Sequence, residues 1–161
     1  MGTAAEIIFR PMQISDVEAV AEMDEICFEE DGWDEDFFLE ELRDEHSDYI
    51  VGEIDGKIIA CAGIKIYLDE AEGMTIAVLP EFQGRGFGKK ILTEIIKIAK
   101  MRGANSMIFE VRVSNVPALH IYQKFGFKIV GRIKRYYMTG EDALTMCAKL
   151  EDLKCKLPSE K

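Results

Sequence analysis

Long apolar runs, an excess of basic residues and clustered cysteines are all missing from this sequence. Lys and Arg together number 20 against 30 Asp and Glu, which gives a formal net charge of -10. This balance argues against a nucleic-acid-binding surface, which needs a basic patch. An acidic surface favours cationic or basic partners, and it also helps to keep a protein in solution. At 161 residues the chain is long enough for one domain with a sizeable core.

No apolar run approaches the roughly 20 residues that a helix needs to cross a membrane. The first residues, MGTAAEIIFR, lack the apolar stretch of a secretory signal peptide. A Met-Gly start is compatible with myristoylation, but Glu6 stands where that motif requires Ser or Thr. The sequence therefore predicts a cytoplasmic protein with no membrane partner.

The cysteines form no metal-binding or redox motif. They are Cys27, Cys61, Cys147 and Cys155. No two of them are spaced as CxxC, and neither His46 nor His120 is clustered with them, so no metal site is predicted. Three of the four lie in apolar patterns, and we expect these to be small buried side chains in a reducing compartment.

Apolar periodicity predicts a single mixed α/β domain over residues 1–150, followed by a charged C-terminal tail over 151–161. Helices are expected from Ser15 to about Phe28 and over 35–45, 87–101 and 114–126. Strands are expected over 6–12, 73–79, 106–113 and 127–133, with hairpins over 49–68 and 135–150.

Short local signals set the expected boundaries of these elements. A Ser15/Glu18 capping box, Asp34 and Ser114 are the predicted helix starts. Gly103 and Gly126 are the predicted helix ends. The pairs Asp55-Gly56 and Thr139-Gly140 are the predicted hairpin turns.

Gly84, Gly86 and Gly88 lie between an apolar run and a helical pattern, in the stretch VLPEFQGRGFGKK. Glycine adopts positive φ and lets a ligand approach the backbone closely. The helix that follows offers free N–H groups and the positive end of its dipole, so the loop predicts an anion site for a phosphate. The spacing fits neither the dinucleotide fingerprint G-x-G-x-x-G nor the P-loop. A plain turn from strand to helix is the alternative.

The same loop also reads Q-x-x-G-x-G, from Gln83 to Gly88 with Arg85 inside it. At these residues the sequence resembles the GNAT family of acetyl-coenzyme A-dependent N-acetyltransferases, whose pyrophosphate loop reads Q/R-x-x-G-x-G/A. The resemblance covers nearly the whole chain, with IAVLPEFQGRGFG, FEVRVSNVPALHIYQKFGF and YYMTGEDALTM in the family's order. Within the family it is most similar to the protein N-terminal acetyltransferases of the RimI and NatA types. It implies the GNAT fold, with a central twisted, mostly antiparallel sheet flanked by helices.

The resemblance implies that acetyl-CoA is the cofactor. The pyrophosphate is expected at the glycine loop and the helix start, which comprise Gln83, Gly84, Arg85, Gly86, Phe87, Gly88 and Lys89. The family pairs the pantetheine arm with the strand before this loop, which assigns the backbone of Ile76, Ala77 and Val78. Asn115, Ala118 and Tyr122 fit the family motif N-x-x-A-x-x-x-Y and are also expected at the cofactor. A plain helix cap is the alternative for Asn115.

Acetyl transfer needs a deprotonated amine and a reprotonated thiolate. Glu110 stands in the motif EVR-x-SN at the place of the RimI-type glutamate, and the resemblance implies that it is the general base. Strand alternation puts Glu110 and Arg112 on one face, so an ion pair between them is the alternative. Tyr122 matches the tyrosine that protonates the CoA sulfur in the family, and a core tyrosine is its alternative.

By resemblance, the acceptor is a protein or peptide N-terminus, such as that of a ribosomal protein. Phe28, Glu29 and Glu30 lie where NatA-type enzymes have a Leu-Pro-Glu-Asn stretch beside the substrate's first residue, although Glu29 replaces the proline. Glu30 is also an alternative general base. Tyr136 and Tyr137 match the tyrosines that hold the incoming peptide backbone, and a pair of strand aromatics is their alternative.

Three functions are weighed. The first is acetylation of protein α-amines, the second is acetylation of a lysine side chain or a small amine on the same fold, and the third is a non-catalytic CoA-binding module. The set Glu110, Asn115 and Tyr122 weighs against a non-catalytic module. The paired tyrosines Tyr136 and Tyr137, with the loop at Phe28, favour acetylation of α-amines over that of lysines or small amines. Glu72 stands near where archaeal relatives have a histidine, so that part of their mechanism does not transfer. The sequence leaves open whether the protein is a monomer or a homodimer.

Overall fold

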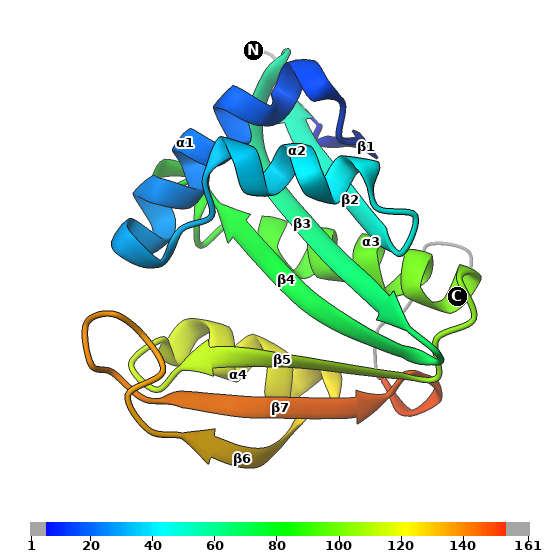
Figure 1. Cartoon of the computed structure of the whole chain (residues 1–161), viewed down its shortest axis with the longest axis vertical. Coiled ribbons are helices and arrows are strands. Elements are labelled where there is room, and N and C mark those ends of the chain that lie inside the picture. Colours follow the sequence, from blue (N-terminus) through cyan, green and yellow to red (C-terminus); the bar gives the residue numbers. More distant parts are fainter. Residues whose placement is uncertain (1–5, 154–161) are drawn as a thin grey trace.

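The computed structural model describes residues 6–153 and contains one seven-stranded sheet (Figure 1). The strands are β1 (Ile8–Pro11), β2 (Ser47–Ile54), β3 (Lys57–Tyr67), β4 (Glu70–Val78), β5 (Ser106–Arg112), β6 (Lys128–Ile133) and β7 (Ala143–Lys149). The helices are α1 (Val17–Phe28), α2 (Glu35–Arg43), α3 (Phe87–Met101) and α4 (Val116–Phe125). Single 3-10 turns lie at η1 (Ile14–Asp16), η2 (Glu29–Asp31), η3 (Pro80–Phe82) and η4 (Leu150–Asp152).

The sheet has the order β1-β2-β3-β4-β5-β7-β6 and is antiparallel except between β4 and β5. Figure 1 shows α1 and α2 in front of the sheet and α3 and α4 behind it. The prediction of a mixed α/β fold with a mostly antiparallel sheet flanked by helices is confirmed. In the part of the chain that the structure describes, no helix is long and apolar enough to span a membrane.

The two halves of the sheet meet over only a short parallel pairing. Glu70, Ala71 and Glu72 of β4 pair with Ser106, Met107 and Ile108 of β5. Beyond these residues the two strands diverge, as Figure 1 shows, and each continues with its other neighbour, β4 with β3 and β5 with β7. The divergence opens a gap in the middle of the sheet.

Helix α3 has the predicted bounds because its sequence carries both a complete apolar face and end signals. Ile91, Leu92, Ile95, Ile96 and Ala99 are fully buried against the sheet. Gly86 precedes the helix with φ 86°, and Gly103 follows it with φ 87°. Both are conformations that glycine adopts without a steric penalty.

Two of the predicted helix starts are wrong, and in both cases a neighbouring side chain makes the cap. The first helical segment begins at η1, where the Asp16 carboxylate accepts from the Gln13 N–H at 2.8 Å, so Ser15 is not the cap. Helix α4 is capped by Asn115, whose side chain accepts from the Ala118 N–H at 3.3 Å, so Ser114 is not the cap. Asp34, by contrast, accepts from the Phe37 N–H as predicted.

The predicted hairpins are found, but the second has a longer loop than expected. Asp55 and Gly56 form the β2–β3 turn with φ 50° and 80°, which is the predicted type I′ geometry. Strand β6 ends at Ile133 and β7 begins at Ala143, so Tyr136 and Tyr137 lie in the connecting loop and not in a strand. The turn at Gly140 is present, since its N–H donates to the Tyr137 carbonyl at 2.8 Å.

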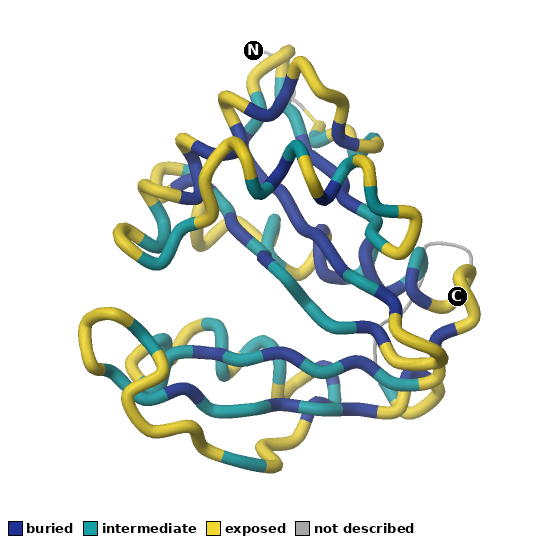
Figure 2. The backbone as a smooth tube through the Cα atoms, in the orientation of Figure 1, coloured by how far each residue is buried: buried dark blue, intermediate teal, exposed yellow. Residues whose placement is uncertain are grey.

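The core fills both sides of the larger half of the sheet: β3 is almost continuously buried in Figure 2, and the middle of β2 and the inner face of α3 are buried as well. Cys61 is fully buried, whereas Cys27 and Cys147 are half-buried, and Cys155 lies outside the described residues. Of the predicted tail, Leu150–Asp152 forms η4 and Leu153 packs against the core. The remainder, 154–161, is outside the described residues, so the boundary at residue 150 stays a prediction.

Gly63 provides a test of this packing. A Cβ at this position in β3 would overlap the ring of Tyr49, and that ring is fixed because its hydroxyl donates to the buried Glu41 carboxylate at 2.7 Å. We therefore expect Gly63→Ala to lower the free energy of unfolding by about 1–3 kcal/mol. Urea unfolding measures this.

Gly131→Ala is the matched control, because a Cβ there makes only an ordinary contact, 3.8 Å from Thr145. It should change the free energy of unfolding little. Equal stability of the two variants would contradict the packing argument.

Candidate active site

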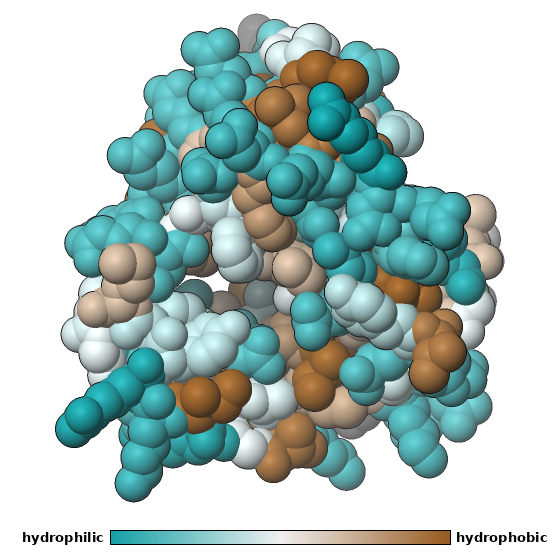
Figure 3. Space-filling model, viewed as in Figure 1, coloured by the Kyte–Doolittle hydropathy of each residue, from teal (hydrophilic) through white to brown (hydrophobic). Residues whose placement is uncertain are grey.

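A cavity of about 440 Å³ lies in the gap between β4 and β5. Figure 3 shows it as a hollow in the face of the molecule, between the two halves of the sheet. Its lining includes the predicted site residues Phe28, Glu30, Ile76, Glu110, Asn115, Tyr122, Tyr136 and Tyr137. Residues far apart in the sequence therefore meet at one place, as the motif assignments require.

Glu110 lies at the centre of β5, opposite Thr145 of β7. Its pKa is raised, first by burial and then by the nearby carboxylate of Glu72. Glu72 is opposite Ile108 in the parallel pair, so strand alternation puts its side chain on the same face as that of Glu110. No Lys, Arg or His side chain among residues 6–153 forms an ion pair with Glu110.

The alternative role considered for Glu110, an ion pair with Arg112, is therefore wrong. Arg112 instead forms ion pairs with Asp31 and Glu141. A half-buried carboxylate whose pKa is raised, and which forms no ion pair among the described residues, has the properties of a general base.

Tyr122 lies on α4 and reaches the cavity from the opposite side of β5. Its ring packs edge-on against Phe109, with the centroids 4.4 Å apart, and more loosely against Phe127. Burial raises the pKa of its hydroxyl above the usual range, which keeps the proton on the phenol. Asn115, which starts the same helix, also lines the cavity, so it is both a cap and a site residue.

The glycine loop leaves space beside the start of α3. Gly84 and Gly86 have φ 78° and 86°, and a Cβ at either would meet no described atom within 4 Å. The first helical hydrogen bond runs from Lys90 to Gly86, so the N–H groups of Phe87, Gly88 and Lys89 have no partner within the helix. This open cradle of donors, at the positive end of a helix of 15 residues, fits a pyrophosphate.

Arg85 does not point freely into this space, because its guanidinium donates to the Glu81 carbonyl and stacks over Phe82.

The edge of β4 that faces the gap has free hydrogen-bonding capacity. Leu79 donates its N–H to Ile59 of the β3 side, so alternation turns the backbone groups of Ala77 toward β3 and those of Ile76 and Val78 toward the gap. Gln83 donates from Nε2 to the Val78 carbonyl at 2.9 Å. Of the three residues predicted for the pantetheine arm, Ile76 therefore presents its backbone to the gap and Val78 presents its N–H, since the Val78 carbonyl already accepts from Gln83, while the backbone of Ala77 faces β3.

The connection between α1 and α2 separates the predicted acceptor residues. Phe28 and Glu30 line the cavity. Glu29, with φ 53°, does not line it and lies instead with Glu18 and Glu25 on an open outer depression, which Glu30 also borders. The expectation that Glu29 joins the acceptor site is not supported by its position. The sharp turn of the chain at this residue is the physical reason.

The loop between β6 and β7 supplies the other wall of the cavity. Tyr136 and Tyr137 pack edge-to-face with centroids 5.0 Å apart, and both line the cavity. Burial raises the pKa of Tyr137 to about 12, partly offset by the nearby Arg112. Both hydroxyls are therefore protonated at neutral pH and available as donors.

Sequence reasoning missed a buried carboxylate behind this site. Asp24 of α1 is 1% exposed and accepts from the Thr75 hydroxyl and the Trp33 N–H, each at 2.7 Å. The Trp33 indole also donates to the Met74 carbonyl at 3.1 Å, so this network fixes the α1–α2 connection to the free edge of β4. In the sequence Asp24 stands between Glu22 and Glu25, so no local signal distinguishes it from a surface carboxylate.

Comparisons with known proteins agree with this arrangement. The model of the Acetyltransferase (GNAT) family matches residues 16–127. "N-alpha-acetyltransferase RimI" of Mycobacterium tuberculosis is 35% identical over 138 residues, covering 82% of this chain and 85% of that protein. "N-alpha-acetyltransferase" of Sulfurisphaera tokodaii is 30% identical over 158 residues, covering 90% of this chain and 94% of that protein.

Among solved structures, that of the ribosomal-protein-S18-alanine N-acetyltransferase from Escherichia coli is similar, with a TM-score of 0.82 and 28% identity. The match covers 90% of this chain and 94% of that one. The predicted fold and the resemblance inferred from the motifs are confirmed: the chain belongs to the GNAT family of acetyltransferases.

Proposed function

We propose that this chain transfers an acetyl group from acetyl-CoA to the α-amine of a protein N-terminus, with a ribosomal protein as one candidate substrate. The observation that carries the proposal is the cavity that holds Glu110, Tyr122 and the paired tyrosines Tyr136 and Tyr137 together. The relatives named as RimI and N-alpha-acetyltransferase support the α-amine as acceptor. Since ribosomal proteins are made in the cytoplasm, such a substrate agrees with the predicted cytoplasmic location.

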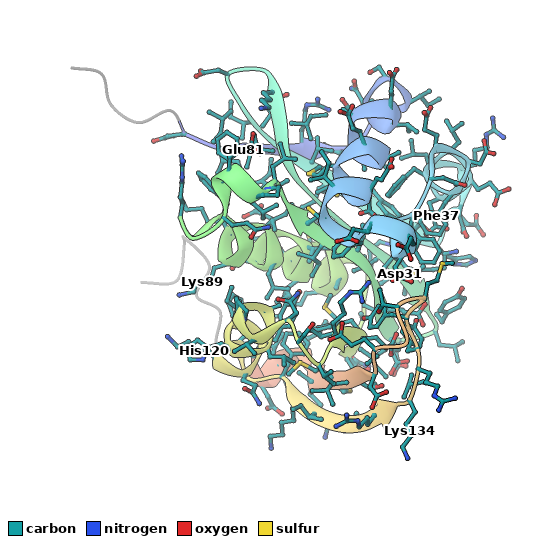
Figure 4. The ribbon with its side chains drawn as sticks, turned by 90° about the vertical axis from the view of Figure 1, so that its left-hand side faces the viewer. Asp31, Phe37, Glu81, Lys89, His120 and Lys134 are labelled. Carbon is teal, nitrogen blue, oxygen red and sulfur yellow. The ribbon has the colours of Figure 1, made fainter. Side chains whose placement is uncertain are left out.

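Proteins of the GNAT family use acetyl-CoA, which supplies the acetyl group as a thioester. We place its pyrophosphate at the N–H groups of residues 87–89 and its pantetheine arm along Ile76 and Val78 at the β4 edge. In Figure 4, Lys89 at the start of α3 lies on the opposite side of the gap from Asp31. The cofactor and the acceptor would therefore enter from different sides and meet at Glu110 and Tyr122.

Replacement of Gly86 tests the cofactor site. A β-branched side chain would fill the open space beside the helix start and would strain a backbone at φ 86°. We expect Gly86→Val to abolish acetyl-CoA binding, measured by isothermal titration calorimetry. Gly56→Val is the matched control, since Gly56 has φ 80°, also has open space around it, and lies in the distant β2–β3 turn. Unchanged acetyl-CoA affinity in a folded Gly86→Val protein would contradict the proposal that the cofactor binds at this loop.

Glu110 has the environment of the group that takes the proton from the acceptor amine. Because burial and Glu72 raise its pKa, the carboxylate form is lost at a higher pH than for an exposed glutamate. The rate at limiting peptide should therefore rise with pH as Glu110 loses its proton. Glu110→Gln should lower turnover by about 10²–10⁴-fold, with partial recovery at high pH as the amine loses its proton unaided. A variant whose pH profile matched that of the wild type would leave Glu110 without this role.

In the proposed reaction Tyr122 returns a proton to the leaving sulfur. Its raised pKa keeps the phenol protonated until that charge develops. Tyr122→Phe should lower kcat by about 10²–10⁴-fold and leave the affinity for acetyl-CoA nearly unchanged, because the hydroxyl acts only in the transition state. Single-turnover kinetics with calorimetry separate the two quantities. A near-normal single-turnover rate of acetyl transfer in the variant would indicate that Tyr122 only packs in the core beside Phe109.

Two peptides that differ only in their available amine test the acceptor. One carries a free α-amine with every lysine replaced by arginine, and the other carries a blocked N-terminus and one internal lysine. We expect mass spectrometry to find acetylation on the first alone. Acetylation of the second alone would favour the lysine or small-amine function. Binding of acetyl-CoA without acetylation of any amine would favour a non-catalytic module.

A further inference from the structure

Arg112, at the end of β5, joins the two loops that enclose the acceptor side of the cavity. Its guanidinium forms an ion pair with Asp31 of η2 and a second, at 3.3 Å, with Glu141 of the β6–β7 loop. It also donates to the Thr139 hydroxyl at 3.2 Å. The planar group stacks over the ring of Tyr137, 4.1 Å from its centroid. Arginine is suited to this task because it forms several hydrogen bonds and a stacking contact at once.

Asp31 holds the same two loops together through both of its carboxylate oxygens. Oδ2 accepts from Arg112, and Oδ1 accepts from the Met138 N–H at 3.0 Å. Figure 4 shows Asp31 at the tip of the α1–α2 connection, beside the β6–β7 loop. The side chains of Asp31 and Arg112 are only 15% and 19% exposed, so solvent screens this pair less than an ordinary surface pair.

A third segment is attached through Glu141. While its Oε1 accepts from Arg112, its Oε2 accepts from the Ser114 N–H at 2.7 Å, directly before the start of α4. The group of Asp31, Arg112, Tyr137 and Glu141, which we call the loop bridge, therefore spans three segments around the cavity. None of these contacts is required to form the sheet, because Arg112 lies at the very end of β5.

We propose that the loop bridge fixes the spacing and orientation of the two walls that receive the acceptor, so that Arg112 and Asp31 are positioning residues for acceptor binding. This inference rests on the proposed function, since it requires a peptide acceptor. Arg112 acts through Tyr137, whose ring it stacks on, and Asp31 acts through the backbone at Met138. Neither residue contacts the cofactor side of the gap, so loss of the bridge should weaken the acceptor alone.

The kinetic test uses Asp31→Ala, Arg112→Gln and the double variant. We expect each single variant to raise KM for the α-amine peptide about tenfold, with kcat and KM for acetyl-CoA nearly unchanged. The double variant should raise KM by less than the product of the two single effects, because the ion pair between Asp31 and Arg112 is already lost in each single variant. Arg132→Gln is the matched control: it breaks the Arg132–Asp142 pair of the same hairpin, at 2.7 Å, and leaves Asp31 and Arg112 in place.

Amide hydrogen exchange at Met138, followed by NMR, tests the bridge without any acceptor. Its exchange should accelerate in Asp31→Ala and stay as in the wild type in Arg132→Gln. Slow Met138 exchange in Asp31→Ala would overturn the bridge. So would unchanged peptide KM in both single variants of an active enzyme, or a parallel loss of peptide and acetyl-CoA binding. A wild-type protein that acetylates no peptide α-amine would overturn the proposed function itself and the acceptor role of the bridge with it.

Discussion

The short parallel contact between β4 and β5 is the constraint on which the rest of the site depends. It is only three residues long on each strand, and it arises where α3 carries the chain back across the sheet. Past this contact each strand is held by its outer neighbour, so the inner edges face each other without pairing. A sheet cannot leave buried backbone groups unsatisfied, and the gap is therefore lined by donors from elsewhere, such as Gln83 at Val78 and Trp33 at Met74. The opening is thus a feature of the fold itself, and it forms the cavity between the two strands.

The charges around this opening are distributed unequally. Arg112 is the cation closest in sequence to Glu110, and Asp31 and Glu141 together engage it. This arrangement leaves Glu110 and Glu72 on one strand face without a cation among the described residues, which raises the pKa of Glu110 through burial and like charge. An amine that enters the cavity would supply the positive charge that the protein itself does not supply there.

Sequence reasoning succeeded where a local signal had no adjacent competitor, and it was wrong at Ser15 and Ser114, where a neighbouring side chain makes the cap. The bounds of α3, the Asp55-Gly56 turn and the Asp34 cap each depend on a few adjacent residues, and all three are found. It failed where the deciding partner is remote: Asp24 meets Thr75, and Asp31 meets Met138, across loops that no local pattern predicts. The motif resemblance predicted more of the site than the local patterns did. It assigned Glu110, Tyr122 and Tyr137, from separate segments, to one site, and all three line the same cavity. Their chemical roles follow from that resemblance and from their environment, and not from periodicity.

The acidic run Glu29-Glu30-Asp31 illustrates why the remaining details depend on three-dimensional structure. In the sequence the three carboxylates are equivalent neighbours, and no local pattern distinguishes one from another. In the fold, the positive φ at Glu29 turns that side chain to the outer surface, and the ion pair with Arg112 neutralises Asp31. Glu30 alone lines the cavity without a side-chain partner among residues 6–153. Under the proposed function, an incoming α-ammonium would therefore face the carboxylates of Glu30, Glu72 and Glu110 in the cavity lining, whereas Asp31 would act through the position of the loop that carries Glu30.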